Sequence, residues 1–132
     1  MRKHNPRVTP LILVADDERD MTDVCCVILT AAGYRVQRAY EGLTAAALAK
    51  AGKPDVAIIN YQMPGMNGLG VLREMREAGL ATQVIITSGT DDFTGLSEQA
   101  LAAGAQAVVR QPGPADWLMR LVPVLVDRVA RA

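Results

Sequence analysis

The chain contains few cysteines and few aromatic residues, and its charges cancel. Its 132 residues include two cysteines, one tryptophan and one phenylalanine, and 14 basic side chains balance 14 acidic ones. A net charge of zero provides no overall attraction to nucleic acid or to an anionic membrane. The start of the chain is basic, and we interpret residues 1–9 as a flexible tail. The composition therefore predicts neither nucleic-acid binding nor membrane binding.

Long apolar runs are also missing. No segment approaches the roughly 20 apolar residues of a membrane helix. The run "LILVA" at 11–15 is too short for the apolar region of a signal peptide, and two aspartates follow it. We therefore expect a cytoplasmic protein.

The two cysteines, Cys25 and Cys26, are neighbours in the sequence. Adjacent side chains on a helix point about 100° apart, which suits neither a disulfide nor a metal site. We expect reduced thiols beside the core, and a redox role is the less favoured alternative.

Two hallmarks of nucleotide-binding or hydrolytic enzymes are missing as well. "ADDERD" follows the first apolar run, where a glycine-rich phosphate loop would stand. The one histidine, His4, lies in the basic tail and offers no catalytic base. We therefore expect no enzymatic activity and no required cofactor, and a small-molecule enzyme or a flavin-binding protein is the disfavoured alternative.

Apolar runs typical of buried strands alternate with segments of helical periodicity. Strands are predicted at 11–15, 34–39, 55–60, 83–89 and 105–110. Helices are predicted at 18–32, 43–52, 68–79, about 95–103, and from about 114 to the C-terminus. Pro123 removes a backbone donor inside the last helix, at a cost of roughly 3 kcal/mol, and predicts a kink or an early end there.

This alternation predicts one α/β domain over residues 10–132, a doubly wound sheet of five parallel strands with three layers, α/β/α. In such sheets functional groups gather beyond the carboxyl ends of the strands, so we expect the side chains there to line one cleft. These side chains are Asp16 and Asp17, Asn60, Thr87 and Ser88, and Arg110 and Gln111.

The acidic pair Asp16 and Asp17 allows two interpretations. Two adjacent carboxylates repel one another unless a cation compensates, and oxygen ligands of this kind suit magnesium. Alternatively, the aspartates cap the helix that follows, because aspartate is a favourable N-cap residue.

Five segments, in this order and at these separations, resemble the receiver domain of bacterial two-component response regulators over roughly residues 10 to 130. The segments are "LVADDE" at 13–18, "PDVAIINYQMPGMNGL" at 54–69, "VIITSG" at 84–89, "AAGAQAVV" at 102–109 and "QP" at 111–112. The resemblance implies a flavodoxin-like fold of receiver topology and a role in a two-component or phosphorelay pathway.

In receivers, an aspartate at the end of the third strand accepts a phosphoryl group from a histidine kinase. That aspartate and the acidic pair hold magnesium, and a lysine after the fifth strand pairs with the phosphoryl oxygens. A serine or threonine after the fourth strand hydrogen-bonds the phosphoryl group, and an aromatic residue on the fifth strand turns inward with it.

Carried over to this sequence, Asp16 and Asp17 match the acidic pair and Ser88 matches the hydroxyl. Three positions depart from the pattern: Asn60 stands at the acceptor, Gln111 at the lysine and Val108 at the aromatic residue. An uncharged amide lacks the nucleophilic oxygen of a carboxylate, so Asn60 is not expected to form the phosphoryl adduct. Magnesium binding by Asp16, Asp17 and Asn60 is expected to be weak or absent.

We therefore expect a stand-alone, degenerate receiver (a pseudo-receiver) that acts through phosphorylation-independent contact with a histidine kinase or another regulator. The alternative is phosphorylation at Asp16 or Asp17 with magnesium. A homodimer is possible through the face made by the fourth helix, fifth strand and fifth helix, where Trp117 and Leu118 are candidate contact residues. The competing interpretations are that Trp117 packs against the sheet and that Ser88 only satisfies nearby backbone.

Overall fold

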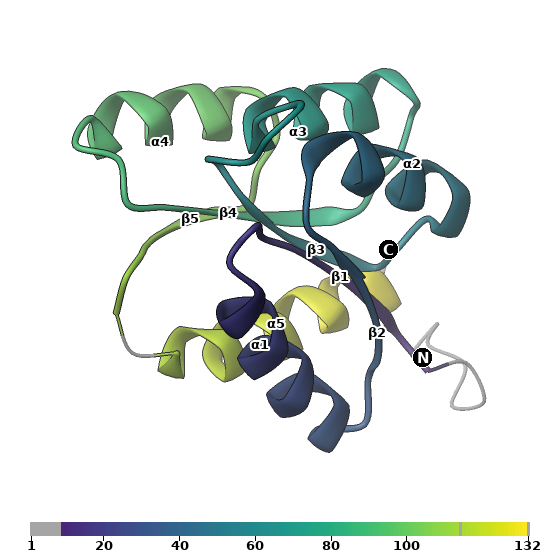
Figure 1. The fold of residues 1–132 in the computed structure, drawn as a ribbon. Coiled ribbons are helices and arrows are strands. Elements are labelled where there is room, and N and C mark those ends of the chain that lie inside the picture. The colour runs from purple at the N-terminus through teal and green to yellow at the C-terminus, as the bar shows by residue number, and fades with distance from the viewer. Residues whose placement is uncertain (1–8, 114, 132) are drawn as a thin grey trace.

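The computed structural model describes residues 9–113 and 115–131, in which strands and helices alternate along the chain (Figure 1). The strands are β1 (Leu11–Ala15), β2 (Arg35–Ala39), β3 (Val56–Asn60), β4 (Gln83–Ser88) and β5 (Ala107–Arg110). The helices are α1 (Arg19–Ala31), α2 (Gly42–Gly52), α3 (Gly68–Glu77), α4 (Phe93–Ala102) and α5 (Asp116–Arg131).

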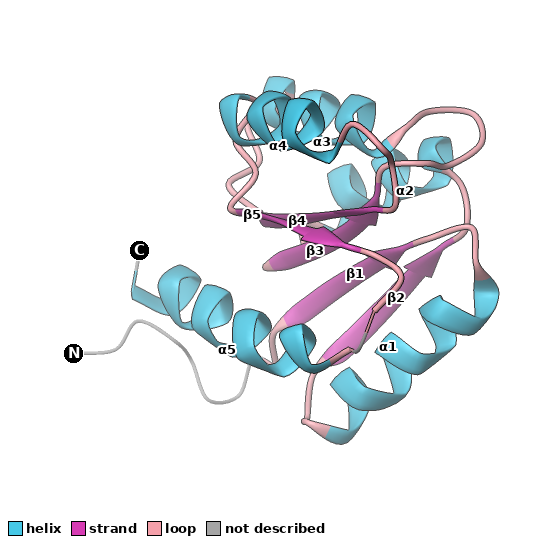
Figure 2. Cartoon of the chain, turned by 90° about the vertical axis from the view of Figure 1, so that its left-hand side faces the viewer, coloured by secondary structure: helices cyan, strands magenta, loops and turns pink. Residues whose placement is uncertain are grey.

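The strands form one parallel sheet in the order β2-β1-β3-β4-β5. Helices α2, α3 and α4 cover one face of the sheet and helices α1 and α5 cover the other, as Figures 1 and 2 show. The doubly wound, three-layer α/β/α fold predicted from the alternation is therefore confirmed. The strand order reverses between β1 and β3, which is where such sheets place their functional groups.

The apolar runs are buried on both faces because successive residues of a strand point to opposite sides of the sheet. Ile59 packs against α2, α3 and α4, whereas its neighbour Ile58 belongs to the core beneath α1 and α5. Cys25 and Cys26 of α1 are free thiols buried in this second core, as the sequence predicted. Burial raises the pKa of the Cys25 thiol to about 11, which keeps it protonated and unreactive.

Of the two outcomes predicted at Pro123, the early end of the last helix is wrong and the kink stays a prediction. Helix α5 continues through Pro123 to Arg131. The buried side chains of Val122 and Leu125 hold α5 against the sheet on both sides of the proline, and this packing offsets the missing backbone hydrogen bond. Pro114, the predicted start of this helix, lies outside the described residues.

The predicted basic tail falls almost entirely on residues 1–8, which lie outside the described residues. Its last residue, Thr9, is held in place, because its carbonyl accepts a hydrogen bond of 3.0 Å from Arg35 Nε. Among the described residues, no helix has the length and apolar character needed to cross a membrane.

The loop between β3 and α3 returns closely to the end of β3. The Gly68 N–H donates to the Tyr61 carbonyl at 2.8 Å, and a Cβ atom on Gly68 would lie 2.5 Å from the Asn60 carbonyl oxygen. Because backbone stands in the way, a side chain at position 68 requires the loop to move.

We predict that Gly68→Ala lowers the free energy of unfolding by about 1–3 kcal/mol, the usual cost of overpacking. Gly113→Ala is the matched control, because a Cβ there lies 3.8 Å from its nearest neighbour, the Arg110 carbonyl oxygen. Urea denaturation measures both variants. Equal midpoints for the two would show that the loop accommodates the methyl group freely.

Candidate functional site

The carboxyl ends of β1, β3, β4 and β5 meet around a cleft of about 360 Å³. The parallel register pairs Ala15 with Ile59 and Asn60 with Thr87, so these strands end at the same edge of the sheet. The polar residues that line the cleft are Asp16, Asp17, Glu18, Asn60, Gln62 and Gln111. The sequence thus placed four of these residues correctly at one site, and it did not anticipate Glu18 and Gln62.

Asp16 lies at the base of the cleft and is only 8% exposed, whereas Asp17 is exposed. Burial, together with the negative charges of Asp17 and Glu18, raises the pKa of the Asp16 carboxyl to about 6. The Glu18 N–H donates a hydrogen bond of 2.9 Å to Asp16 Oδ1, and this bond lowers the pKa of the carboxyl, though by less than burial raises it. At neutral pH, Asp16 therefore carries a charge that the fold disfavours.

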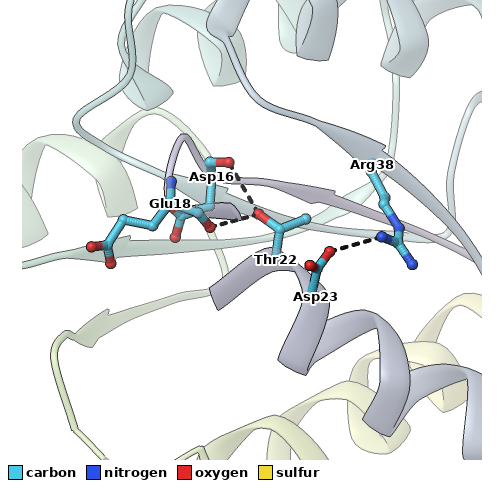
Figure 3. A network of polar contacts seen from close by, with 5 residues as sticks. All are labelled: Asp16, Glu18, Thr22, Asp23 and Arg38. Carbon is cyan, nitrogen blue, oxygen red and sulfur yellow. Dashed lines mark hydrogen bonds and ion pairs between the residues drawn. The ribbon is translucent and has the colours of Figure 1, made fainter. Parts of the chain in front are cut away.

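The first turn of α1 fixes the backbone around Asp16, as Figure 3 shows. The buried Thr22 hydroxyl lies 3.0 Å from the Asp16 carbonyl and 3.1 Å from the Glu18 carbonyl, and it donates to both. Neither aspartate is the N-cap residue, which is Glu18, and the Glu18 side chain makes no capping hydrogen bond; the Asp16 carboxyl accepts the Glu18 N–H. The nearby ion pair of Asp23 and Arg38, at 2.8 Å, is exposed and adds little stability.

Asn60 directs its amide nitrogen into the cleft. Its Nδ2 donates to the Gln62 carbonyl at 2.8 Å and lies 3.4 Å from Asp16 Oδ1. A backbone carbonyl can only accept, so the nitrogen must be the atom facing Gln62. The Asn60 oxygen then accepts a long hydrogen bond of 3.4 Å from the Thr87 hydroxyl. The amide thus presents a donor to Asp16, where a carboxylate would present a second negative charge.

The predicted magnesium ligands do not form a complete set of anionic oxygens. The nitrogen of Asn60, not its oxygen, faces Asp16. Nor do the described residues include any group of three histidine, cysteine, aspartate or glutamate side chains that could hold a metal ion. Asp16 and Asp17 are the anionic ligands that remain, and weak or absent magnesium binding stays a prediction.

The hydroxyl nearest Asn60 belongs to Thr87 and not to Ser88, which the sequence placed in the cleft. Ser88 is fully buried, and its oxygen accepts the Thr90 N–H at 3.0 Å. This hydrogen bond agrees with the competing interpretation from the sequence, in which Ser88 only satisfies nearby backbone. Adjacent residues of a strand face opposite sides of the sheet, so only Thr87 can point toward Asn60. The pairing of Asn60 with Thr87 in the folded sheet decides this, and the sequence by itself does not specify that register.

Gln111 lines the cleft from the end of β5, as predicted. Both polar atoms of its side chain are shielded from solvent and have no hydrogen-bond partner among the described residues. Val108 packs against the core under α2, α3 and α4. Near it, the Arg110 guanidinium lies 4.3 Å from the centre of the Phe93 ring and joins β5 to the start of α4.

Trp117 and Leu118, the predicted contact residues, are not available for contact. Trp117 is 6% exposed and Leu118 is fully buried, and both belong to the core beneath α1 and α5. The expectation of an exposed aromatic anchor is therefore wrong, and Trp117 packs inside the fold. Trp117 and Leu118 form the apolar face of the first turn of α5, and an amphipathic helix packs its apolar face against the sheet.

The disfavoured charge of Asp16 leads to a prediction about stability and pH. A folded-state pKa of about 6, above the ordinary value of 3.8, means that Asp16 favours folding below about pH 4 and that this stability is lost as the pH rises through 6. Asp16→Asn should raise the free energy of unfolding at pH 7 by about 1–3 kcal/mol, because one pKa unit corresponds to about 1.4 kcal/mol. The gain should vanish at pH 4.

Urea denaturation between pH 4 and 8 measures this effect. Asp91→Asn is the control, since Asp91 is exposed in the loop before α4 and is not among the groups that raise the pKa of Asp16, so its replacement should shift the midpoint little at any pH. Loss of stability in Asp16→Asn at pH 7 would show that the ionised carboxylate is needed to hold the β1–α1 junction.

The sequence is similar to those of known signalling proteins. The family model for the response regulator receiver domain matches residues 12–122. The transcriptional regulatory protein KdpE of Mycobacterium tuberculosis is 36% identical over 112 residues, which are 84% of this chain and 49% of KdpE. This chain spans about half the length of the curated relatives that it matches.

Solved structures of receiver domains also have the same fold as this chain. A Francisella response regulator receiver domain superimposes with a TM-score of 0.84 at 28% identity, covering 91% of this chain and 98% of that one. The receiver domain of the response regulator NarL from Mycobacterium tuberculosis gives a TM-score of 0.80 at 29% identity, covering 89% of this chain and 96% of that one.

Proposed function

Because the chain belongs to the response regulator receiver family, we propose that it is a pseudo-receiver, which signals in a two-component pathway by protein contact without phosphorylation at position 60. The observation that carries this proposal is the amide of Asn60 at the end of β3, beside Asp16. The other proposed features are that the protein is cytoplasmic, that it is not an enzyme and that it requires no cofactor.

Two features of the cleft support the loss of phosphoryl transfer. The lone pair of the Asn60 amide nitrogen is delocalised into the carbonyl group, so this atom is not a nucleophile. The family pattern has an ionised carboxylate oxygen at this position. Among the described residues no basic side chain lines the cleft, because Gln111 stands where the family pattern has a lysine, so none of them would neutralise phosphoryl oxygens.

The same contacts indicate that the cleft is held in one arrangement without a phosphoryl group. The Asn60 amide bridges Asp16, the Gln62 carbonyl and the Thr87 hydroxyl, and so joins β1, the β3–α3 loop and β4. Ser88 is committed to the Thr90 backbone, and Val108 lacks an aromatic ring that could turn inward. We propose that the protein presents one constant surface to its partner.

The proposed partners are a histidine kinase or another regulator of the pathway, with a homodimer through α4, β5 and α5 as one form of self-association. The candidate contact side chains are now exposed apolar ones of α4 and α5, namely Leu101, Met119 and Val124. They replace the buried Trp117 and Leu118. We propose no nucleic-acid contact for this chain, although relatives about twice as long are named transcriptional regulators.

The alternative function is phosphorylation at Asp16 or Asp17 with magnesium. The structure offers little support for it. Burial raises the pKa of Asp16 and favours its neutral form, and the Asp16 Oδ1 already accepts the Glu18 N–H. Asp17 is accessible, but the described part of the chain places no basic side chain in the cleft beside it.

Incubation with a small phosphodonor and magnesium, followed by intact-mass spectrometry, tests the proposal. We predict that the chain gains no phosphoryl group, because the cleft contains neither the carboxylate nucleophile at position 60 nor a stabilising cation. A stoichiometric gain that disappears in Asp16→Asn or Asp17→Asn would instead establish the alternative acceptor.

A further inference from the structure

A small cavity lies next to the cleft, between the sheet and the helices α1 and α5. Four residues with polar side chains line it: Asp16, Thr87, Gln111 and Trp117. The remaining lining is apolar or thiol-bearing and includes Ile58 of β3 and Cys25 of α1. Asp16 and Gln111 also line the open cleft, so the two spaces share part of a wall.

Three polar atoms in this wall have no hydrogen-bond partner among the described residues. They are the indole nitrogen of Trp117 and both the oxygen and the nitrogen of the Gln111 side chain. All three atoms are shielded from solvent, and the Trp117 residue as a whole is only 6% exposed. A buried polar group without a hydrogen-bond partner destabilises the folded state, so three in one place would lower the stability of a small domain substantially.

The size of the cavity restricts what can satisfy these atoms. The volume open to the centre of a water molecule is about 10 Å³. By this measure one water requires roughly 10–15 Å³, so a nucleotide, a flavin or a metabolite is too large. The indole N–H can only donate, which disfavours a metal ion beside it.

We propose that this cavity is a binding site for one ordered water molecule, held by the Trp117 indole and the Gln111 amide. The water accepts from Trp117 Nε1 and from Gln111 Nε2, or donates to Gln111 Oε1. Its other hydrogen points to the Thr87 hydroxyl or to the Asp16 carboxylate. Buried waters typically make about three hydrogen bonds, and this wall supplies that number.

The site gives Gln111 a role that differs from that of the residue it replaces in the receiver pattern. It ties the end of β5, through the water, to the first turn of α5, where Trp117 is anchored. This link is internal and independent of phosphorylation, so the inference does not rest on the proposed function.

The single tryptophan makes the site directly observable by NMR, because the chain has one indole N–H. In the ¹⁵N-labelled protein we expect cross-peaks between the indole proton and the water resonance that have opposite signs in NOESY and ROESY, which marks a long-lived bound water and distinguishes it from proton exchange with solvent. In Gln111→Met, which keeps the length of the side chain and removes both polar atoms, we expect these cross-peaks to be lost. Their absence from the parent protein would overturn the proposal.

Urea denaturation of the same variant provides an independent readout. If the water is present, Gln111→Met removes its partners and lowers the denaturation midpoint. If the cavity is dry, the same change removes two unpaired polar atoms and raises the midpoint, which would also contradict the proposal. Gln99→Met is the matched control, because Gln99 is exposed on α4 and its replacement should leave the midpoint unchanged.

Discussion

Asn60→Asp combined with Gln111→Lys is expected to convert a chain that gains no phosphoryl group into one that gains a single group from a small phosphodonor. The double change restores the carboxylate at the end of β3 and places a cation at the end of β5. Both positions line the same cleft, so one exchange supplies the nucleophile and the other neutralises the incoming charge.

The contacts of Asn60 indicate why Asn60→Asp alone should be modified only weakly. An aspartate would place an oxygen where the amide nitrogen now lies 2.8 Å from the Gln62 carbonyl and 3.4 Å from Asp16 Oδ1. Both neighbours are acceptors, so the new carboxylate would be repelled and its pKa raised. A lysine at position 111 and added magnesium relieve this repulsion, so modification should require magnesium and should be weaker in Asn60→Asp alone.

Intact-mass spectrometry of the parent, both single variants and the double variant measures this series. Gln111→Lys alone should remain unmodified because it has no nucleophile at position 60. A phosphoryl group on the parent or on this single variant would mean that another residue is the acceptor. A double variant that stays unmodified although it folds would mean that further parts of the cleft, such as Ser88, have lost their role.

Trp117→Ala is expected to lower the free energy of unfolding by about 3–5 kcal/mol, a large part of the 5–15 kcal/mol typical of a small domain. Trp117 packs beside Leu118 in the core beneath α1 and α5, and truncation leaves a cavity next to Asp16 and Cys25. A residue that served only as an interface anchor would lower partner affinity and leave the isolated chain stable.

Chemical denaturation of the isolated protein separates these two outcomes. Met119→Ala is the control, because Met119 lies on the same helix and is 40% exposed, so its truncation should cost less than about 1 kcal/mol. A similar small effect for Trp117→Ala would indicate that the indole contributes little to the core and would reopen its role in contact.

The fold could be predicted from the sequence because its signals are local. "LILVA" and "DVAIIN" are continuous apolar runs that only a strand buried on both faces can accommodate, and their alternation with helical periods leaves a parallel sheet as the simple solution. The error at Pro123 has a tertiary cause. The proline weakens the helix locally, but the buried neighbours Val122 and Leu125 keep α5 intact.

The site could be predicted only in part. Asp16, Asp17, Asn60 and Gln111 were placed at one cleft because parallel strands end at a common edge. The choice between Thr87 and Ser88 depends on which of two adjacent side chains faces Asn60, and this is set by strand pairing. Likewise, the burial of Trp117 depends on how α5 is rotated against the sheet, which two apolar neighbours in the sequence do not specify.

By itself the sequence determined the order of strands and helices and the chemistry of position 60, because periodicity and side-chain type are properties of the chain alone. Only the tertiary structure decided which atom of the Asn60 amide faces Asp16, because that choice depends on the Gln62 carbonyl and the Thr87 hydroxyl brought to it by folding. Folding likewise brought Trp117 and Gln111 to one buried cavity, since a contact between distant residues exists only once the sheet and its helices have packed.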